Sequence, residues 1–498
     1  MPMTIDPGDA HADLAGLAGL APDQRASRHR QRAGGARQPR RHSPRPLVRS
    51  ATGAGLAVML GAALLVATTG ASSASVDETP NAVLAWNANA GDAAIAACIA
   101  PLDNPLHESH LYAMAQIAVH DALNAIDLRS RPYAFVGRAL PGASPEAAVA
   151  AAARGVLVPV LEQLTEPFGP ECIDAGVAVV EADYTAAIGA IPAGRARSRG
   201  IRVGENAAAA ILALRADDGS DTPLLDFDYP QGTEPGEYRF TPGQTFAFAP
   251  GWGEVTPFVL TDSSQYRPGL PYPVDSTRYA ADFVEVKNLG GDDLTTPSAR
   301  TEEQTEIACF WLVSSPLMWN QIARTVAGSE HLDLWDSSRL LGLLNMALAD
   351  GYVGSFDTKY DDNFWRPVTA IQTARTDGNP LTVADPTWTP LVPTPPIPDH
   401  DAAHAVEGGA GAAVLAGFFG TNRIPFAANS IALPEGVCND PEPVVRHFTS
   451  FSQAAAENAA SRIYIGFHFR HAAEAGTNHG GKIGIAAVLR YMQPLPTR

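Results

Sequence analysis

Three short segments in the C-terminal third of the chain carry the side chains best suited to chemistry. They are residues 359–367, 398–405 and 461–468. Together they supply three cations, Lys359, Arg366 and Arg462, and two imidazoles, His404 and His468. Guanidinium and ammonium groups bind a small tetrahedral oxyanion, and imidazoles transfer protons or form a bond to its central atom. The set therefore predicts an oxyanion site.

Spacing within the segments supports one shared site. Lys359 and Arg366 are seven residues apart, or two turns if helical, so both heads can reach one side. Arg462 and His468 lie six apart across Gly466, which allows close backbone approach. His404 begins a helical pattern, and backbone N–H groups at a helix N-terminus favour an anion. Taken singly, each segment fits a solvated helix face or a buried polar residue, so the prediction rests on their co-occurrence.

Composition favours a globular, acidic protein. The chain has 498 residues, of which 46% are hydrophobic and 18% charged, and its formal net charge is −18. Residues 1–75 contain nine arginines and four aspartates, which leaves 26 basic against 49 acidic residues, or −23, in the rest. Such a chain would repel nucleic acid phosphates, so no nucleic acid partner is expected. Cations grouped against this background need a local reason.

The first 75 residues read as an export signal with a basic leader. Residues 25–49 are basic and polar, residues 53–69 form an uncharged apolar run, and residues 71–75 are small. This order is typical of secretion signals, so we expect a secreted protein with no stable membrane anchor after cleavage. An uncleaved apolar run would instead hold the protein at the outer face of the membrane.

Four cysteines, Cys98, Cys172, Cys309 and Cys438, follow this signal, and none forms a C-x-x-C pair. In an exported chain they allow two disulfides in any of three pairings. Buried free thiols are the alternative.

Hydrophobic periodicity predicts an all-α fold, with residues 76–498 as a single large helical domain. Helical spacing covers residues 107–126, 147–164, 172–191, 195–216, 279–288, 301–313, 319–326, 337–356, 365–374, 403–419, 444–462 and 480–491. Residues 76–104 look extended, and no convincing strand alternation is present. Residues 222–278 are rich in Pro, Gly and aromatic residues and predict a long irregular segment that wraps the domain and narrows the entrance to a site. Large helical faces make a homodimer possible.

The order and spacing of the three segments resemble a known signature. K-x6-R-P, then a proline-led segment ending in His, then S-R-x3-G-x-H is similar to the pattern of the superfamily that holds vanadium-dependent haloperoxidases and type 2 phosphatidic acid phosphatases. Residues 304–311, 319–322 and 111–126 also resemble the secreted bacterial haloperoxidase-like branch. The resemblance covers most of residues 100–490 and implies a helical bundle of the vanadium chloroperoxidase and acid phosphatase type.

The resemblance also implies roles for the five residues. Lys359, Arg366 and Arg462 resemble the residues that neutralise the equatorial oxygens of vanadate, His468 resembles the axial vanadium ligand, and His404 resembles the acid–base residue. The implied function is a secreted vanadate-dependent haloperoxidase that oxidises halide with hydrogen peroxide, with halide or a small organic substrate as the expected partner besides peroxide. One alternative is an acid phosphatase with phosphate in the same site and His468 as nucleophile. The other is a non-catalytic oxyanion-binding protein.

The middle segment departs from the family pattern P-S-G-H, because it reads Asp401-Ala402-Ala403-His404. Ala402 lacks the hydroxyl that would donate to an anion oxygen, a hydrogen bond worth about 1.5–3 kcal/mol. Ala403 keeps a backbone N–H that can face the anion. The Asp401 carboxylate is expected either to weaken anion binding or to pair with His404.

Three other departures concern the surroundings of the site. Ser314 stands where many relatives carry an acid that orients the acid–base His. Phe356 and Ile397 fall where haloperoxidases place aromatic or His residues near the halide.

The surroundings of the ligand His also depart from the pattern. The sequence offers Ala472 at the position of any acid behind His468, which leaves Arg470 and His471 as candidates for a supporting role. Asp399 and His400 receive no role.

Overall fold

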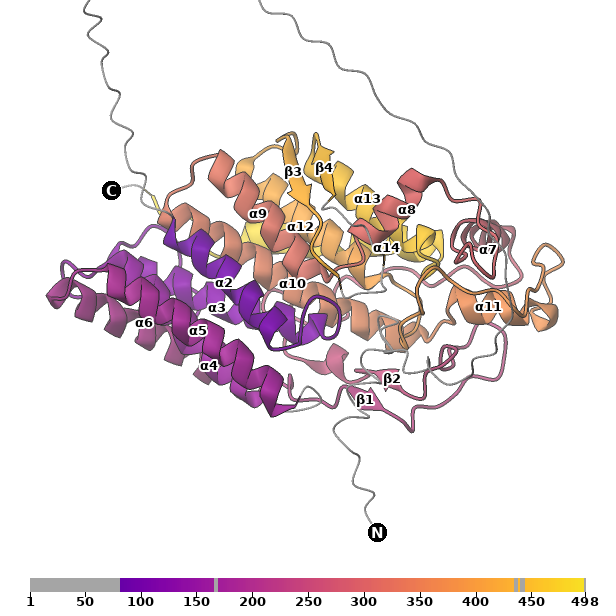
Figure 1. Cartoon of the computed structure of the whole chain (residues 1–498), viewed down its shortest axis with the longest axis horizontal. Helices are drawn as coiled ribbons and strands as arrows, with labels where there is room; N and C mark the ends of the chain where they lie inside the picture. The colour runs from indigo at the N-terminus through magenta and orange to yellow at the C-terminus, as the bar shows by residue number, and fades with distance from the viewer. Residues whose placement is uncertain (1–80, 165–168, 434–437, 439–443, 497–498) are drawn as a thin grey trace, which may run out of the picture. The chain divides into compact units, whose positions relative to one another are not determined.

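The computed structural model describes residues 81–164, 169–433, 438 and 444–496. The predicted export signal, residues 1–75, lies outside this range, as does the apolar run. Across the described residues the predicted all-α fold is confirmed, because most of the chain is helical (Figure 1). None of the described helices combines the length and apolarity needed to cross a membrane. The division into domains and the homodimer stay predictions.

The helices are α2 (Ala82–Ala96), α3 (Pro105–Ile126), α4 (Pro145–Gln163), α5 (Pro170–Ala190), α6 (Arg195–Leu214), α7 (Thr277–Leu289), α8 (Glu302–Phe310), α9 (Ser315–Ser329), α10 (Leu334–Asp362), α11 (Pro367–Thr373), α12 (Ala403–Phe419), α13 (Phe451–Tyr464) and α14 (Arg470–Arg490). Most of them match the predicted helical stretches. Residues 82–96, predicted to be extended, form α2 instead. The Asn81 side chain caps this helix by accepting hydrogen bonds from two first-turn amides, and alanines supply the helix propensity.

Helix α10 is the centre of the packing that positions the site. Nearly every residue from Ser337 to Lys359 is buried, and the helix packs against α3, α12 and α14. The closest packing joins α12 to α14, where glycine removes the side chain at the crossing: a Cβ on Gly480 would lie 1.8 Å from the Val406 carbonyl oxygen. Helices α12 and α10 therefore hold their ends in fixed positions near the candidate site.

The first segment of the predicted site spans a helix end and a turn. Helix α10 continues through Lys359 to Asp362, so the prediction that this helix ends at residue 356, before Lys359, is wrong. Asn363 then adopts a left-handed conformation (φ 46°), which ends the helix, and Pro367 starts α11 at a position where its missing N–H costs nothing. Lys359 and Arg366 thus come from two elements rather than from one helix.

Short strands occur where none was predicted. β1 (Leu225–Asp226) pairs with β2 (Ala247–Phe248), and β3 (Phe426–Asn429) pairs with β4 (Val445–Phe448), both antiparallel. The predicted helix over residues 444–462 is therefore wrong at its start, where β4 precedes α13. Phe426 and Phe448 pair across β3 and β4 and are buried, which fixes the register.

The segment 222–278 is irregular, as predicted, apart from β1, β2 and one 3-10 turn, η1 (Trp252–Glu254). Asp350 of α10 fixes part of it, because its carboxylate accepts hydrogen bonds from the N–H groups of Phe258, Val259 and Leu260 at 2.6–2.7 Å. Arg267 adds an ion pair to Asp357 of the same helix at 2.8 Å. The segment is therefore fastened along α10.

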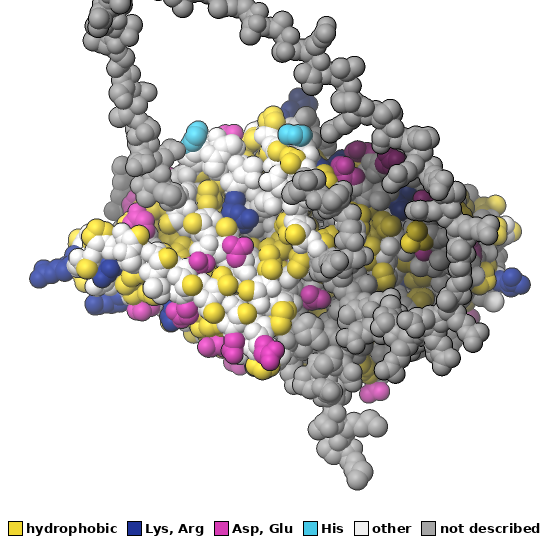
Figure 2. Space-filling model, viewed as in Figure 1, with side chains coloured by type: hydrophobic (Ala, Val, Ile, Leu, Met, Phe, Trp, Pro, Cys, Tyr) yellow, Lys and Arg dark blue, Asp and Glu magenta, His cyan; other side chains and the backbone are white. Residues whose placement is uncertain are grey.

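All four cysteines are paired, as Cys98–Cys172 and Cys309–Cys438. The structure thus selects one of the three possible pairings and excludes free thiols. On the face drawn in Figure 2, acidic side chains are interspersed with apolar ones, and several basic side chains gather at its left end. The three cations of the predicted site are buried, so they belong to the interior.

Candidate oxyanion site

The first and second predicted segments meet at Lys359. This residue lies in the last turn of α10 and is fully buried. Its ammonium group donates hydrogen bonds to the carbonyl oxygens of Pro398 (2.9 Å) and Asp399 (3.1 Å). These two hydrogen bonds fix the segment that leads into α12 against the end of α10.

Arg366 joins the first segment to the third. Its Nε donates to the Ile397 carbonyl oxygen at 2.6 Å, and its Nη1 donates to the Phe467 carbonyl oxygen at 2.8 Å. The same Nη1 lies 2.8 Å from His468 Nε2. Because a guanidinium only donates, His468 Nε2 must present its lone pair in this arrangement. That lone pair accepts from Arg366 here, and it is the one that a ligand or an electrophile would engage in place of this hydrogen bond.

The turn after α13 places Arg462 and His468 on the same site. The amides of Phe467 and His468 both donate to the Arg462 carbonyl oxygen, at 3.0 and 3.2 Å. Gly466 makes the turn possible, since its φ is +87° and a Cβ would lie 2.6 Å from the Gly290 carbonyl oxygen. Glycine is required at this position on both counts.

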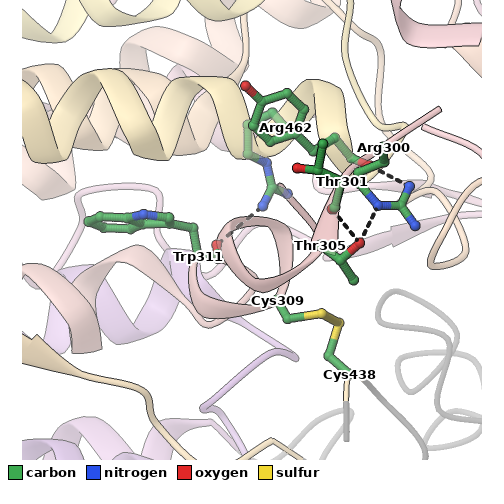
Figure 3. The surroundings of a disulfide bond; sticks show 8 residues. Arg300, Thr301, Thr305, Cys309, Trp311, Cys438 and Arg462 are labelled. Atoms are coloured by element: carbon green, nitrogen blue, oxygen red, sulfur yellow. Dashed lines mark hydrogen bonds between the residues drawn. A yellow bond between two sulfur atoms is a disulfide. The ribbon is translucent and has the colours of Figure 1, made fainter. Parts of the chain in front are cut away.

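Arg462 is the cation with the most unused hydrogen-bonding capacity. It is 3% exposed, its Nη1 donates to the Trp311 carbonyl oxygen at 3.3 Å, and its Nε has no partner among the described residues. Figure 3 shows that this contact lies beyond the end of α8, the helix that the Cys309–Cys438 disulfide anchors. The end of α8 therefore contacts a buried guanidinium whose Nε–H has no hydrogen-bond partner among the described residues.

No carboxylate of the described chain forms an ion pair with Lys359, Arg366 or Arg462. Burial lowers the pKa of Lys359 to about 7, of Arg366 to about 10 and of Arg462 to about 9. Repulsion by Arg366 adds to the effect at Lys359 and Arg462, whereas the Asp399 carboxylate opposes it at Arg366. An unpaired buried ion costs several kcal/mol. Among the described residues no carboxylate is in contact with these three cations. The cluster therefore has the charge that an anion-binding site requires.

The Asp399 carboxylate lies close to the Nδ1 side of the His468 ring. Its Nδ1 lies 3.0 Å from Asp399 Oδ1, so the expectation that Ala472 leaves this position empty is corrected. Burial raises the pKa of Asp399 to about 7, and burial together with the Arg366 cation lowers the pKa of His468 well below its usual value. His468 is thus a neutral imidazole with Nδ1 towards Asp399 and Nε2 towards the cations.

His404 occupies the first turn of α12 and is the one member of the five that is partly exposed. Its Nε2 lies 3.2 Å from the Val313 carbonyl oxygen. The backbone carbonyl of Val313 therefore contacts this ring. Many relatives were expected to orient the ring with an acid at the position that Ser314 occupies here. Burial and the Arg462 cation lower the pKa of His404 well below its usual value. With Nε2–H bound to the carbonyl, Nδ1 is the basic atom.

The middle segment forms the start of α12. Ala402 is the N-cap of α12, is fully buried and gives the helix no side-chain cap. Ala403 follows as the first helical residue. The Asp401 carboxylate accepts a hydrogen bond from Ser355 (2.7 Å) and contacts His479 Nδ1 (2.8 Å), so the expected alternative of a pair with His404 is wrong.

The other candidates lie around the site rather than in it. Phe356 is buried on α10 and packs edge-on to Tyr352, while Ile397 contributes only its carbonyl to Arg366.

Neither candidate for the supporting role behind His468 contacts that residue. Arg470 pairs with Glu285, and His471 stacks on Tyr272 with ring centroids 3.8 Å apart. Asp399 is the carboxylate that approaches His468, although the 3.0 Å contact is not aligned as a hydrogen bond and Asp399 Oδ1 has no hydrogen-bond partner among the described residues. Sequence spacing could not identify this approach because the two residues lie in different segments.

Comparison with known proteins finds relatives of the part of the chain that holds the site. Residues 339–496, which contain all three segments, match the family model of the VCPO second helical-bundle domain. Vanadium chloroperoxidase of Curvularia inaequalis is 28% identical over 286 residues. That alignment covers 46% of this chain and 46% of the relative, so it spans about half the length of each.

Solved structures share the fold. A bacterial vanadium-dependent iodoperoxidase superposes with a TM-score of 0.67 at 23% identity, covering 84% of this chain and 98% of that one. The holo form of a bacterial vanadium-dependent chloroperoxidase gives 0.61 at 16% identity, covering 78% and 93%. At these identities the likeness concerns the fold.

Proposed function

We propose that this chain, whose residues 339–496 match the VCPO second helical-bundle domain and which is similar to vanadium chloroperoxidase, binds vanadate at His468 and oxidises halide with hydrogen peroxide. The observation that carries the proposal is the group of three buried cations with no carboxylate partner, beside an imidazole lone pair. Vanadate fits this donor set, because it is a small oxyanion that accepts from guanidinium and ammonium groups and coordinates imidazole nitrogen.

The residues divide the work between binding and proton transfer. Lys359, Arg366 and Arg462 would hold the anion oxygens, and His468 would ligate through Nε2 while Asp399 fixes its orientation. The bound vanadate supplies Lewis-acid activation of peroxide. His404, neutral and held by Val313, accepts a proton at Nδ1 and returns it during the reaction. Burial of the cations keeps water from screening their charge.

The test is direct. Protein incubated with orthovanadate and freed of excess should retain about one vanadium per chain and oxidise halide in the presence of peroxide. Chloride, bromide and iodide tested side by side give the preference. Retained vanadium without oxidation of any halide would remove the haloperoxidase proposal.

A phosphatase is the second candidate, supported by the same cations and by the Asp399 carboxylate behind His468. In that reaction His468 Nε2 attacks a phosphate ester and His404 protonates the leaving group. A phosphohistidine trapped at His468 would favour this candidate, and its absence together with no ester hydrolysis would exclude it. If phosphate and vanadate bind without turnover in either assay, the protein is a non-catalytic oxyanion binder.

We also propose that the protein is secreted. Disulfides persist in oxidising compartments, so the Cys98–Cys172 and Cys309–Cys438 bonds support secretion. An N-terminal sequence of the protein from culture medium, starting near residue 76, is the expected result.

Anion affinity is expected to fall as pH rises above about 7. In the anion-free protein the pKa of Lys359 is about 7, so its positive charge is present below that pH and lost above it. Binding above pH 7 must therefore take up a proton. Molybdate is a suitable probe because its charge stays constant in this range. Titration calorimetry in buffers of different ionisation enthalpy measures the uptake, and Lys359→Arg should abolish it. Affinity that stays flat through this range would contradict the assignment.

Ala402→Ser is expected to raise both the stability of the protein and its affinity for vanadate. At the N-cap of α12 a Ser hydroxyl can accept a first-turn N–H, worth about 1 kcal/mol. The same hydroxyl can donate to an anion oxygen, so affinity for vanadate should rise roughly tenfold or more. Thermal unfolding and calorimetry measure the two effects. A stability gain without an affinity gain would place residue 402 out of reach of the anion.

A further inference from the structure

The Asp401 carboxylate is buried between α10 and α14, just before the start of α12. It is 0% exposed, and one of its oxygens accepts a hydrogen bond from the Ser355 hydroxyl of α10 at 2.7 Å. The other oxygen lies 2.8 Å from Nδ1 of His479 on α14. A Cβ on Gly354 would lie 3.0 Å from Nε2 of the same ring, so the absence of a side chain there lets the ring pack against α10. Three segments of the chain therefore meet at this carboxylate.

The Asp401 carboxyl group is ionised at neutral pH. Burial alone would raise its pKa, but the electrostatic interaction and the hydrogen bond with His479, with smaller effects of His400 and Lys359, outweigh burial. The pKa of Asp401 therefore lies below its usual value. Because a carboxylate only accepts hydrogen bonds, His479 donates from Nδ1 and Ser355 donates from its hydroxyl. Two donors thus hold a negative charge in one position in the interior.

This carboxylate lies close to the Lys359 side chain. Ser355 and Lys359 are four residues apart on α10, so their side chains share one face of the helix. Side chains of an α-helix lean towards its N-terminus, which directs Lys359 back over the turn that contains Ser355. The Lys359 ammonium group donates to the Asp399 carbonyl oxygen at 3.1 Å, and Asp399 precedes Asp401 by only two residues. Contacts on both sides therefore place the Asp401 carboxylate near the ammonium group.

The charges around Lys359 make Asp401 its main counter-charge. The ionisable groups that interact with this ammonium are those of Arg366, Asp399, Asp401, His404, Arg462 and His468. Burial and then Arg366 lower the pKa of Lys359 to about 7, and Asp401 has the largest effect in the opposite direction. Asp399 raises this pKa less than Asp401 does. Without the Asp401 charge, Lys359 would therefore lose its proton at a lower pH.

We propose that Asp401, held in place by Ser355 and His479, is a positioning residue of the oxyanion site that keeps the Lys359 ammonium group charged for the anion. This role rests on the proposed function, in which Lys359 binds an oxyanion. One expectation from the sequence was the opposite, namely that a carboxylate in the middle segment weakens anion binding by repulsion. The two roles differ in sign. Removing the Asp401 charge tightens anion binding if the carboxylate only repels the anion, and weakens it if the carboxylate supports Lys359.

The test uses Asp401→Asn, which keeps the shape of the side chain and removes its charge. The probe is molybdate, titrated calorimetrically into the vanadate-free protein at a series of pH values, so the outcome does not depend on enzymatic activity. An opposite charge near an ionisable group shifts its pKa by about one unit or more, and one unit changes a proton-dependent affinity about tenfold. The affinity of Asp401→Asn should therefore be about tenfold below that of the wild type above about pH 8, and the loss should shrink towards about pH 5.

Asp350→Asn is the matched control. Asp350 of α10 is also a fully buried carboxylate, but it accepts its hydrogen bonds from the backbone amides of residues 258–260. This variant should lose thermal stability without changing the pH dependence of molybdate binding. His479→Asn keeps a side-chain donor towards Asp401, so it should retain the wild-type pH dependence.

Three results for Asp401→Asn would overturn this role: unchanged affinity, tighter binding, or a loss that is the same at every pH and is therefore only structural. If thermal unfolding shows that Asp401→Asn is not folded, Asp401→Ser takes its place in the same titration. A wild type that binds no molybdate overturns this role and the oxyanion site together. A wild type that binds molybdate and vanadate but oxidises no halide overturns only the haloperoxidase, and the result for Asp401 stands.

Discussion

Replacing Arg462 with methionine is expected to weaken oxyanion binding roughly tenfold to a hundredfold while raising the stability of the anion-free protein. A charge-assisted hydrogen bond to the anion is worth about 1.5–3 kcal/mol. In the anion-free state, however, Arg462 is a buried cation with one hydrogen bond and no ion pair, so its desolvation is uncompensated. An apolar side chain of similar length should be better tolerated there, by about 1 kcal/mol or more. Thermal unfolding and calorimetry measure the two effects.

Opposite signs in the two measurements separate an anion-binding cation from a structural one. Arg446 is the matched control, since it forms ion pairs with Glu303 and Glu457 at 2.6 Å. Arg446→Met should lower stability and leave anion affinity unchanged. If Arg462→Met also lowers stability and binds anion normally, Arg462 serves the fold alone.

His468→Ala is expected to lose retained vanadate and activity by at least about a hundredfold. His468 offers the one imidazole lone pair directed at the cation group, and supporting residues behind a metal ligand already change affinity by about 10–100-fold. Asp399→Asn tests that support: it keeps the shape and removes the charge 3.0 Å from Nδ1, so affinity should fall by about 10–100-fold. Vanadium content after gel filtration measures both variants.

Two outcomes would contradict this assignment. Vanadate retained at wild-type levels by His468→Ala would mean that the cations hold the anion without a nitrogen ligand. Equal affinity in Asp399→Asn and the wild type would mean that the Asp399 contact does not orient the ring. His471→Ala is the control for both, because His471 stacks on Tyr272 outside the site.

The parts of the site that sequence reasoning identified are those with short-range spacing. Lys359 with Arg366, and Arg462 with His468, each lie within one short segment, and the structure brings all four together. Asp399 was not identified because its approach to His468 depends on how the segment before α12 packs against α10. Lys359 of α10 fixes that segment by a hydrogen bond to the Asp399 carbonyl oxygen. Residue spacing along the sequence does not predict a contact between two separate segments.

The fold shows the same division. Long helices with strong periodicity, such as α10 and α12, were predicted with small errors at their ends. Residues 445–448 form strand β4 rather than the start of the predicted helix. The strand depends on pairing with β3, a separate segment of the chain. Likewise, the backbone carbonyl that orients His404 comes from Val313 on another element and has no side-chain signature.

Titration of orthovanadate into the anion-free protein tests the central claim most directly. The claim is that the buried cations Lys359, Arg366 and Arg462 hold one oxyanion at His468, which Arg366 contacts. The predicted result is a single saturable site per chain, blocked by an excess of phosphate and weakened in Arg462→Met. The contradicting result is no saturable binding by a protein whose thermal unfolding shows it to be folded.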